Sequence, residues 1–156
     1  MNKKFNKSVL ITGGSQGLGL VIASKFIKKG FDVIIVARKK DSLNKAFKSL
    51  LKIKNQNQQL IQVQADISKP KDCEKIFNSI KLNLKKIDVL INNAGVFGPM
   101  GELTKLPWDE FLENININLL GTIYMCKLAI PYLKKIKNGN IINISGGGAA
   151  TPFPPL

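Results

Sequence analysis

Histidine is absent from this sequence, and cysteine occurs only twice, as Cys73 and Cys126. Without histidine the sequence supplies no histidine general base, no histidine metal ligand and no serine–histidine catalytic pair. The two cysteines are isolated and lack Cys-x-x-Cys spacing, which is typical of a protein kept in a reducing compartment. We therefore expect a cytoplasmic protein without a metal site.

Long apolar runs are also missing. None approaches the ~18 consecutive residues that a membrane span requires. The lysine-containing N-terminus is followed by an apolar run at residues 9–11, which is shorter than the ~7–15-residue core of a signal peptide. The sequence consequently predicts no membrane partner.

Acidic residues are scarce, with 10 aspartates and glutamates against 24 lysines and arginines and a formal net charge of +14. A charge of this size can attract nucleic acid. The lysines are scattered, however, and no basic run is interleaved with aromatic side chains that would stack on bases. We expect no nucleic-acid partner and keep a basic nucleic-acid binder only as a third hypothesis.

What the sequence does contain is a regular alternation of apolar and amphipathic segments. Its 156 residues, 44% of them hydrophobic and 22% charged, have the size and composition of one globular domain. Continuous Val- and Ile-rich runs are typical of parallel strands covered on both faces, and the helix-periodic stretches between them indicate helices. The expected strands are residues 8–12, 32–37, 60–65, 88–92 and 140–145, and the expected helices are residues 17–29, 41–54, 70–84 and 107–135.

This alternation predicts an α/β fold, a Rossmann-like doubly wound parallel sheet with strand order 3-2-1-4-5. Pro131 lies late in the last expected helix and should end or kink it. We expect one dinucleotide-binding domain over residues 1–156, C-terminally incomplete and truncated after the fifth strand. The outer edge of that strand should then be unpaired and its apolar faces partly uncovered.

A glycine-rich turn joins the first expected strand to the first expected helix and reads Thr12-Gly-Gly-Ser-Gln-Gly-Leu-Gly19. Backbone N–H groups at a helix start lie at the positive end of the helix dipole, which suits a phosphate. Gly13 can take a backbone angle closed to other residues, Gly17 leaves room for a pyrophosphate, and Gly19 lets the helix lie close to the strand. Because no Lys-Ser or Lys-Thr follows, the turn favours a dinucleotide over the mononucleotide of a P-loop.

Small, polar or charged residues follow the other expected strands at the carboxyl edge of the sheet, where ligands of such folds bind. They are Arg38, Asp66, the turn Asn92-Asn-Ala-Gly95, and Ser145. Each has a simpler interpretation, with Asp66 as a helix cap, Arg38 as a solvated surface charge, and the asparagine segment as a plain turn. Their occurrence together at one edge favours a binding site.

Taken together, these motifs resemble those of the short-chain dehydrogenase/reductase family. The matching segments are the glycine-rich turn, Asp66-Ile67, Asn92-Asn-Ala-Gly95 and Asn118-Leu-Leu-Gly121, in this order within residues 8–145. The glycine spacing is that of the shorter oxidoreductase branch, unlike the extended sugar-modifying branch. The resemblance implies an oxidoreductase that transfers hydride between a nicotinamide dinucleotide and an alcohol or carbonyl substrate.

The resemblance also implies which residues contact the coenzyme. They are Gly13, Ser15, Gln16, Gly17, Leu18 and Gly19 at the pyrophosphate, Asp66 and Ile67 at the adenine, and Asn93, Ala94 and Gly95 along the adenosine. Asn118 resembles the family's catalytic asparagine, which holds a water molecule in a proton relay; the alternative is an asparagine that ties helix backbone to the sheet. By the same resemblance the helix expected at residues 107–135 is a self-association face, so the complete protein is expected to be a homo-oligomer.

The end of the second strand bears on the choice of coenzyme. A protein that binds NAD usually presents a carboxylate there, which accepts hydrogen bonds from the ribose hydroxyls. This sequence has Arg38, Lys39 and Lys40 instead. A guanidinium can hold a 2′-phosphate through paired charge-assisted bonds worth roughly 1.5–3 kcal/mol. We therefore expect NADP(H) in preference to NAD(H).

The sequence departs from the family at the catalytic residues. The family's Tyr-x-x-x-Lys pair handles the proton, but neither Tyr124 nor Tyr132 is followed by a lysine four positions later. Ser145 is the candidate for the carbonyl-orienting serine, although Gly146 follows it and the hydroxyl stands one residue early. Its alternative is a strand-end serine that bonds its own backbone. We expect an inactive fragment of an oxidoreductase, and the alternative is a non-catalytic dinucleotide-binding module or regulatory subunit.

Overall fold

A computed structural model describes residues 6–84 and 86–146. Its strands form one parallel sheet of 5 strands in the order β3-β2-β1-β4-β5. The strands are β1 (Ser8–Thr12), β2 (Asp32–Ala37), β3 (Leu60–Gln64), β4 (Val89–Asn92) and β5 (Asn140–Asn143). The Rossmann-like sheet and the strand order expected from the sequence are confirmed.

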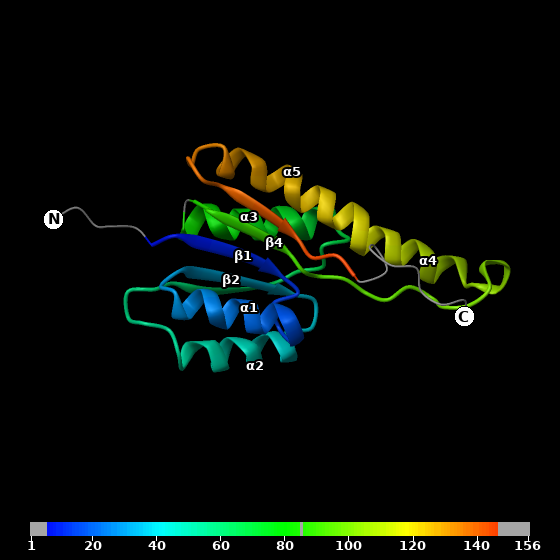
Figure 1. Ribbon diagram of the computed structural model, residues 1–156, viewed down its shortest axis with the longest axis horizontal. Coiled ribbons are helices and arrows are strands. Elements are labelled where there is room, and N and C mark those ends of the chain that lie inside the picture. Colours follow the sequence, from blue (N-terminus) through cyan, green and yellow to red (C-terminus); the bar gives the residue numbers. More distant parts are fainter. Residues whose placement is uncertain (1–5, 85, 147–156) are drawn as a thin grey trace.

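Helices cover both faces of this sheet, as Figure 1 shows. On one face lie α1 (Gly17–Lys28) and α2 (Lys40–Leu51), and on the other lie α3 (Pro70–Asn83) and α5 (Thr122–Leu133). The short turn η1 (Leu103–Lys105) precedes α4 (Trp108–Ile115), which lies beyond the carboxyl end of the sheet. None of the described helices combines the length and the apolarity needed to cross a bilayer.

Alternate residues of the strands build a core on each face of the sheet. In β1, Val9 and Ile11 pack with the α1 and α2 side, whereas Leu10 packs with the α3 and α5 side. This follows from the two-residue period of a strand, because successive side chains point to opposite faces. Full burial of one such side chain stabilises the fold by roughly 1.5–3 kcal/mol. The two cores hold the carboxyl ends of the strands together at one edge.

The helix expected at residues 107–135 is divided into three segments. A π-helical stretch, η2 (Asn116–Gly121), separates α4 from α5. The backbone remains helical through the junction, since Asn116 has φ −61° and ψ −38°, close to ordinary α-helical values. The apolar periodicity of the sequence therefore continues across it and does not reveal the π-helical stretch. The helix α5 passes through Pro131 and ends at Leu133, two residues beyond the proline. Single-turn π segments often mark functional sites, and Asn118 lies in this one.

β5 is the last strand of the sheet in the described part of the chain. Among the described residues β5 pairs only with β4, and Ile142 and Ile144 at this edge are 43% and 42% exposed. The partly uncovered apolar side chains expected at this strand are therefore present in the described part of the chain. Such an edge is a template for pairing with a further strand.

Candidate functional site

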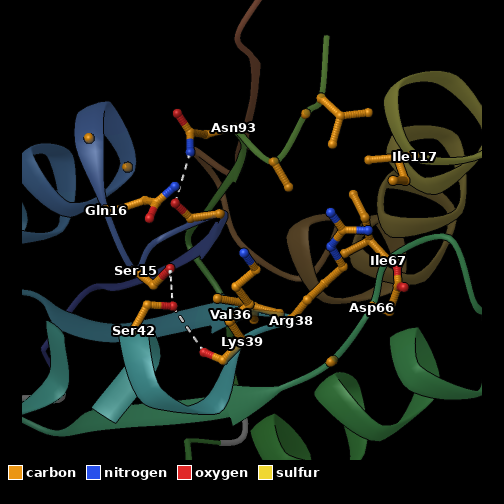
Figure 2. A pocket seen from close by; sticks show the side chains of 18 of the residues that line it. Ser15, Gln16, Val36, Arg38, Lys39, Ser42, Asp66, Ile67, Asn93 and Ile117 are labelled. Carbon is orange, nitrogen blue, oxygen red and sulfur yellow. Dashed lines mark hydrogen bonds between the residues drawn. The ribbon is translucent and has the colours of Figure 1, made fainter. Parts of the chain in front are cut away.

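A cleft of about 400 Å³ opens at the carboxyl edge of the sheet, between the β1–α1 turn and η2 (Figure 2). All the residues that the sequence predicts as coenzyme contacts line it, namely Gly13, Ser15, Gln16, Gly17, Leu18, Gly19, Arg38, Asp66, Ile67, Asn93, Ala94 and Gly95. It is also lined by residues not predicted as contacts: Val36, Ala37, Lys39, Ser42, Ala65, Val96 and Ile117. Segments far apart in the sequence thus form one continuous site.

The glycine-rich turn has the geometry that its sequence predicts. Gly13 and Gly17 have φ of +66° and +51°, the left-handed region in which other residues are strained. A Cβ on Gly17 would meet nothing within 4 Å, whereas a Cβ on Gly19 would lie 2.5 Å from Asn93 Nδ2. Gly17 therefore leaves an opening into the cleft, and Gly19 permits α1 to pack directly against the turn after β4.

The start of α1 is suited to an anion. Its cap residue, Gln16, makes no side-chain hydrogen bond to the first turn, and the first turn contains no acidic residue. The first N–H groups of a helix have no partner within the helix and carry the positive end of its dipole. A phosphate placed in the opening beside Gly17 would accept from these groups.

Thr12 fixes the position of the asparagine turn relative to the glycine turn. Its buried Oγ1 accepts hydrogen bonds from the backbone N–H groups of Asn93 and Ala94, each at 3.0 Å. In the reverse direction, Asn93 Nδ2 donates to the carbonyls of Thr12 at 3.0 Å and Gly13 at 3.2 Å. Thr12 was not predicted as a site residue, although a hydroxyl at the end of a buried strand was a signal in the sequence.

We expect Thr12→Val to lower the free energy of unfolding by about 2–4 kcal/mol, because the isosteric side chain leaves two backbone N–H groups without their acceptor. Thr12→Ser keeps the hydroxyl and should cost much less. Urea denaturation of the two variants beside the unmodified chain measures the difference. Equal stability of the valine and serine variants would show that the hydroxyl does not hold the two turns together.

Asp66 caps the turn that precedes α3, not the helix itself. Its Oδ1 accepts from Ser68 N at 3.0 Å and from Ser68 Oγ at 2.8 Å, while the helix cap is Lys69. The backbone N–H of Asp66 donates to Asp72 Oδ2 at 2.8 Å. The interpretation of Asp66 as a helix cap is thus wrong, and these bonds hold the Asp66 carboxylate at the wall of the cleft.

Two cations from the end of β2 line the cleft, and they differ in their partners. Arg38 Nη1 donates to Glu113 Oε1 of α4 at 3.2 Å, with 45% and 59% of the two side chains exposed. Lys39 forms no ion pair with any described residue, and Figure 2 shows its side chain pointing into the cleft. Beside it, Ser42 Oγ donates to Ser15 Oγ at 3.4 Å. This part of the cleft offers cationic and hydroxyl groups to an anion.

The two candidate catalytic residues do not line this cleft. Asn118 Oδ1 accepts from Val96 N at 2.9 Å and its Nδ2 donates to Val96 O at 2.8 Å, so its amide ties η2 to the segment after β4. Ser145 is exposed beyond β5, and its Oγ lies 3.5 Å from Gly146 O. The described contacts of both side chains are thus to backbone atoms of this chain.

Two groups with displaced pKa values also lie outside the cleft. Burial raises the pKa of the Cys73 thiol to about 11. A hydrogen bond from Tyr124 OH to the Glu74 carboxylate at 3.0 Å raises the pKa of that tyrosine. Both groups therefore stay protonated at neutral pH and are poor nucleophiles or bases.

Comparison with known proteins identifies the family. The sequence profile of the short chain dehydrogenases matches residues 7–155. The chain belongs to the short-chain dehydrogenase family. It is 36% identical over 150 residues to 11-beta-hydroxysteroid dehydrogenase-like 3 of Arabidopsis thaliana, an alignment that covers 95% of this chain and 47% of the relative.

Solved structures of this fold superpose on nearly the whole chain. NAD+-bound xylitol dehydrogenase is 25% identical with a TM-score of 0.88, over 98% of this chain and 58% of that structure. L-sorbose reductase from Gluconobacter frateurii, complexed with NADPH and L-sorbose, is 26% identical with a TM-score of 0.87, over 96% of this chain and 56% of that structure. The chain thus spans about half the length of the curated short-chain dehydrogenase relatives it matches.

Proposed function

We propose that this chain binds a nicotinamide dinucleotide in the cleft at the carboxyl edge of its sheet, with NADP(H) preferred over NAD(H). The observation that carries the proposal is the lining of the cleft, which contains all the predicted contact residues around an uncapped, acid-free helix start. The solved neighbours support the coenzyme class, since one is NAD+-bound and another is complexed with NADPH. Because the solved neighbours include both coenzyme forms, the preference for NADP(H) rests on the cations of this chain.

The residues of the cleft fit the parts of such a coenzyme. The turn from Gly13 to Gly19, with its opening at Gly17, would receive the pyrophosphate. Asp66 and Ile67 would meet the adenine, with Asn93, Ala94 and Gly95 along the adenosine. Arg38 would hold the 2′-phosphate by charge-assisted bonds, and Lys39 adds a second cation on the same wall.

For the complete protein we propose hydride transfer between the coenzyme and a small alcohol or ketone substrate. When bound, the coenzyme supplies or accepts the hydride. Ser145 is proposed to donate a hydrogen bond to the substrate oxygen, and Asn118 to hold a water molecule in a proton relay. We further propose a cytoplasmic homo-oligomer with residues 1–156 as one dinucleotide-binding domain.

The second candidate function is a non-catalytic dinucleotide-binding module that pairs with another subunit. The observation that favours it is that β5 pairs only with β4 among the described residues and that Ile142 and Ile144 are exposed there. An isolated module would bind the coenzyme with the same residues. The two functions therefore share the binding prediction and differ only in turnover.

Calorimetric titration with NADPH and NADH tests the coenzyme preference. We expect NADPH to bind at least about tenfold more tightly, and Arg38→Asp to remove this difference because it loses a charge-assisted bond worth about 1.5–3 kcal/mol. Lys40→Asp makes the same charge change two residues later and is the control. Equal affinity for the two coenzymes, or an unchanged preference in the Arg38 variant, would contradict the choice of NADP(H).

A further inference from the structure

Glu113 is the one residue of α4 that makes an ion pair within the described part of the chain, and it does so with Arg38 at the end of β2. The pair joins residues 75 positions apart in the sequence. Arg38 lines the cleft, whereas Glu113 does not. The carboxylate therefore meets the guanidinium from outside the cleft and occupies Nη1, one of the donor atoms that Arg38 could present to an anion.

Charged side chains of both signs surround Arg38 at this corner of the cleft. Arg38 and Lys39 are the cations of the lining and Asp66 is its acid. Glu113 lies 3.2 Å from Arg38, and an adjoining hollow that Arg38 and Asp66 also line includes Lys69, Asp72 and Lys75. An incoming phosphate dianion thus meets an Arg38 that already has a carboxylate partner, whereas Lys39 has none among the described residues.

We propose that Glu113 is a specificity-determining residue that limits the affinity of the cleft for the coenzyme's 2′-phosphate. Its carboxylate competes with the phosphate for Arg38 and repels it across the guanidinium. This inference rests on the proposed coenzyme site and adds a residue from α4 that sets how strongly the site distinguishes a 2′-phosphate from a free 2′-hydroxyl. The affinity for the rest of the coenzyme does not depend on Glu113.

Glu113 also has an effect that raises the affinity for the 2′-phosphate, because the ion pair holds Arg38 in position before the ligand binds. That effect is small, because both side chains are about half exposed and exposed pairs order their partners weakly. A glutamine at this position keeps an oxygen acceptor for Arg38 and removes only the negative charge. The variant Glu113→Gln therefore isolates the electrostatic competition from the positioning of Arg38.

The test uses calorimetry with two fragments of the coenzyme, 2′,5′-ADP and 5′-AMP. We expect Glu113→Gln to bind 2′,5′-ADP about three- to tenfold more tightly, the effect of removing one partly screened charge close to the phosphate. Its affinity for 5′-AMP should be unchanged. The gain should shrink at high salt, since both carboxylate and phosphate are reached by solvent.

Glu110→Gln is the matched control, because it removes the same charge from an exposed residue of the same helix that has no ion pair in the described structure. It should leave the affinity for both fragments unchanged. If Glu113→Gln binds 2′,5′-ADP no more tightly than the unmodified chain, while both fragments bind, the role of Glu113 is wrong and the coenzyme site stands. An equal gain in the Glu110 variant would also overturn it. Failure of the unmodified chain to bind either fragment would refute the coenzyme site, and this inference with it.

Discussion

Gly17→Leu abolishes most coenzyme binding, with an expected loss of affinity of about 100-fold or more, while the chain remains folded. Gly17 has no neighbouring atom within 4 Å of where a Cβ would stand and opens into the cleft. A leucine side chain fills the space that we assign to the pyrophosphate and keeps it from the N–H groups of α1. The loss of two charge-assisted hydrogen bonds of about 1.5–3 kcal/mol each accounts for this magnitude.

Gly30 offers a matched control for this variant. Its φ is +86°, and a Cβ there would also meet nothing within 4 Å, but Gly30 follows α1 at the opposite end from the cleft. Gly30→Leu should therefore bear a similar backbone strain of about 1–2 kcal/mol without any effect on binding. Thermal denaturation compares the two stabilities, and titration with NADPH compares the affinities. If the Gly17 and Gly30 variants bind NADPH with the same affinity, the glycine turn does not bind the coenzyme.

The sheet and most of the cleft follow from local patterns in the sequence. Residues 9–11 alternate between two cores, and continuous apolar runs of this kind predict buried parallel strands. Once the strands and their order are set, their carboxyl ends must meet at one edge. For this reason residues as distant as Gly13 and Asp66 could be assigned to one site before their positions were known.

Other parts of the site depend on packing that no local pattern encodes. Ile117 lines the cleft from η2, and Ser42 lines it from α2. In the sequence neither residue differs from the other apolar or polar residues of its helix in a way that indicates a site. The pair of Arg38 and Glu113 joins exposed side chains from separate elements, and nothing in either flanking sequence indicates it. The π-helical form of η2 is equally hidden, since it differs from an α-helix in hydrogen bonding more than in composition.

Both tyrosines of the chain are held in structural contacts. Tyr124 OH donates to the Glu74 carboxylate at 3.0 Å, which raises its pKa and opposes loss of the phenolic proton. The ring of Tyr132 lies 5.6 Å from that of Phe77, between α5 and α3. Neither tyrosine lines the cleft, and neither has a lysine four positions later. In the family's Tyr-x-x-x-Lys pair the positive charge of the lysine lowers the pKa of the tyrosine. Neither of these contacts has that effect.

We therefore expect this 156-residue chain to bind NADPH and to show no measurable turnover of ketones or aldehydes. Positioned general acid–base catalysis typically contributes about 10²–10⁴-fold, and neither tyrosine of the chain lies at the cleft to donate the proton as the family's tyrosine does. The assay follows NADPH absorbance over a panel of carbonyl substrates, with the binding titration on the same sample as proof that the site is intact. NADPH consumption that grows with chain concentration and survives repurification would contradict the prediction. If Tyr124→Phe then abolished this activity, Tyr124 would be the donor of the substrate proton, despite its hydrogen bond to Glu74.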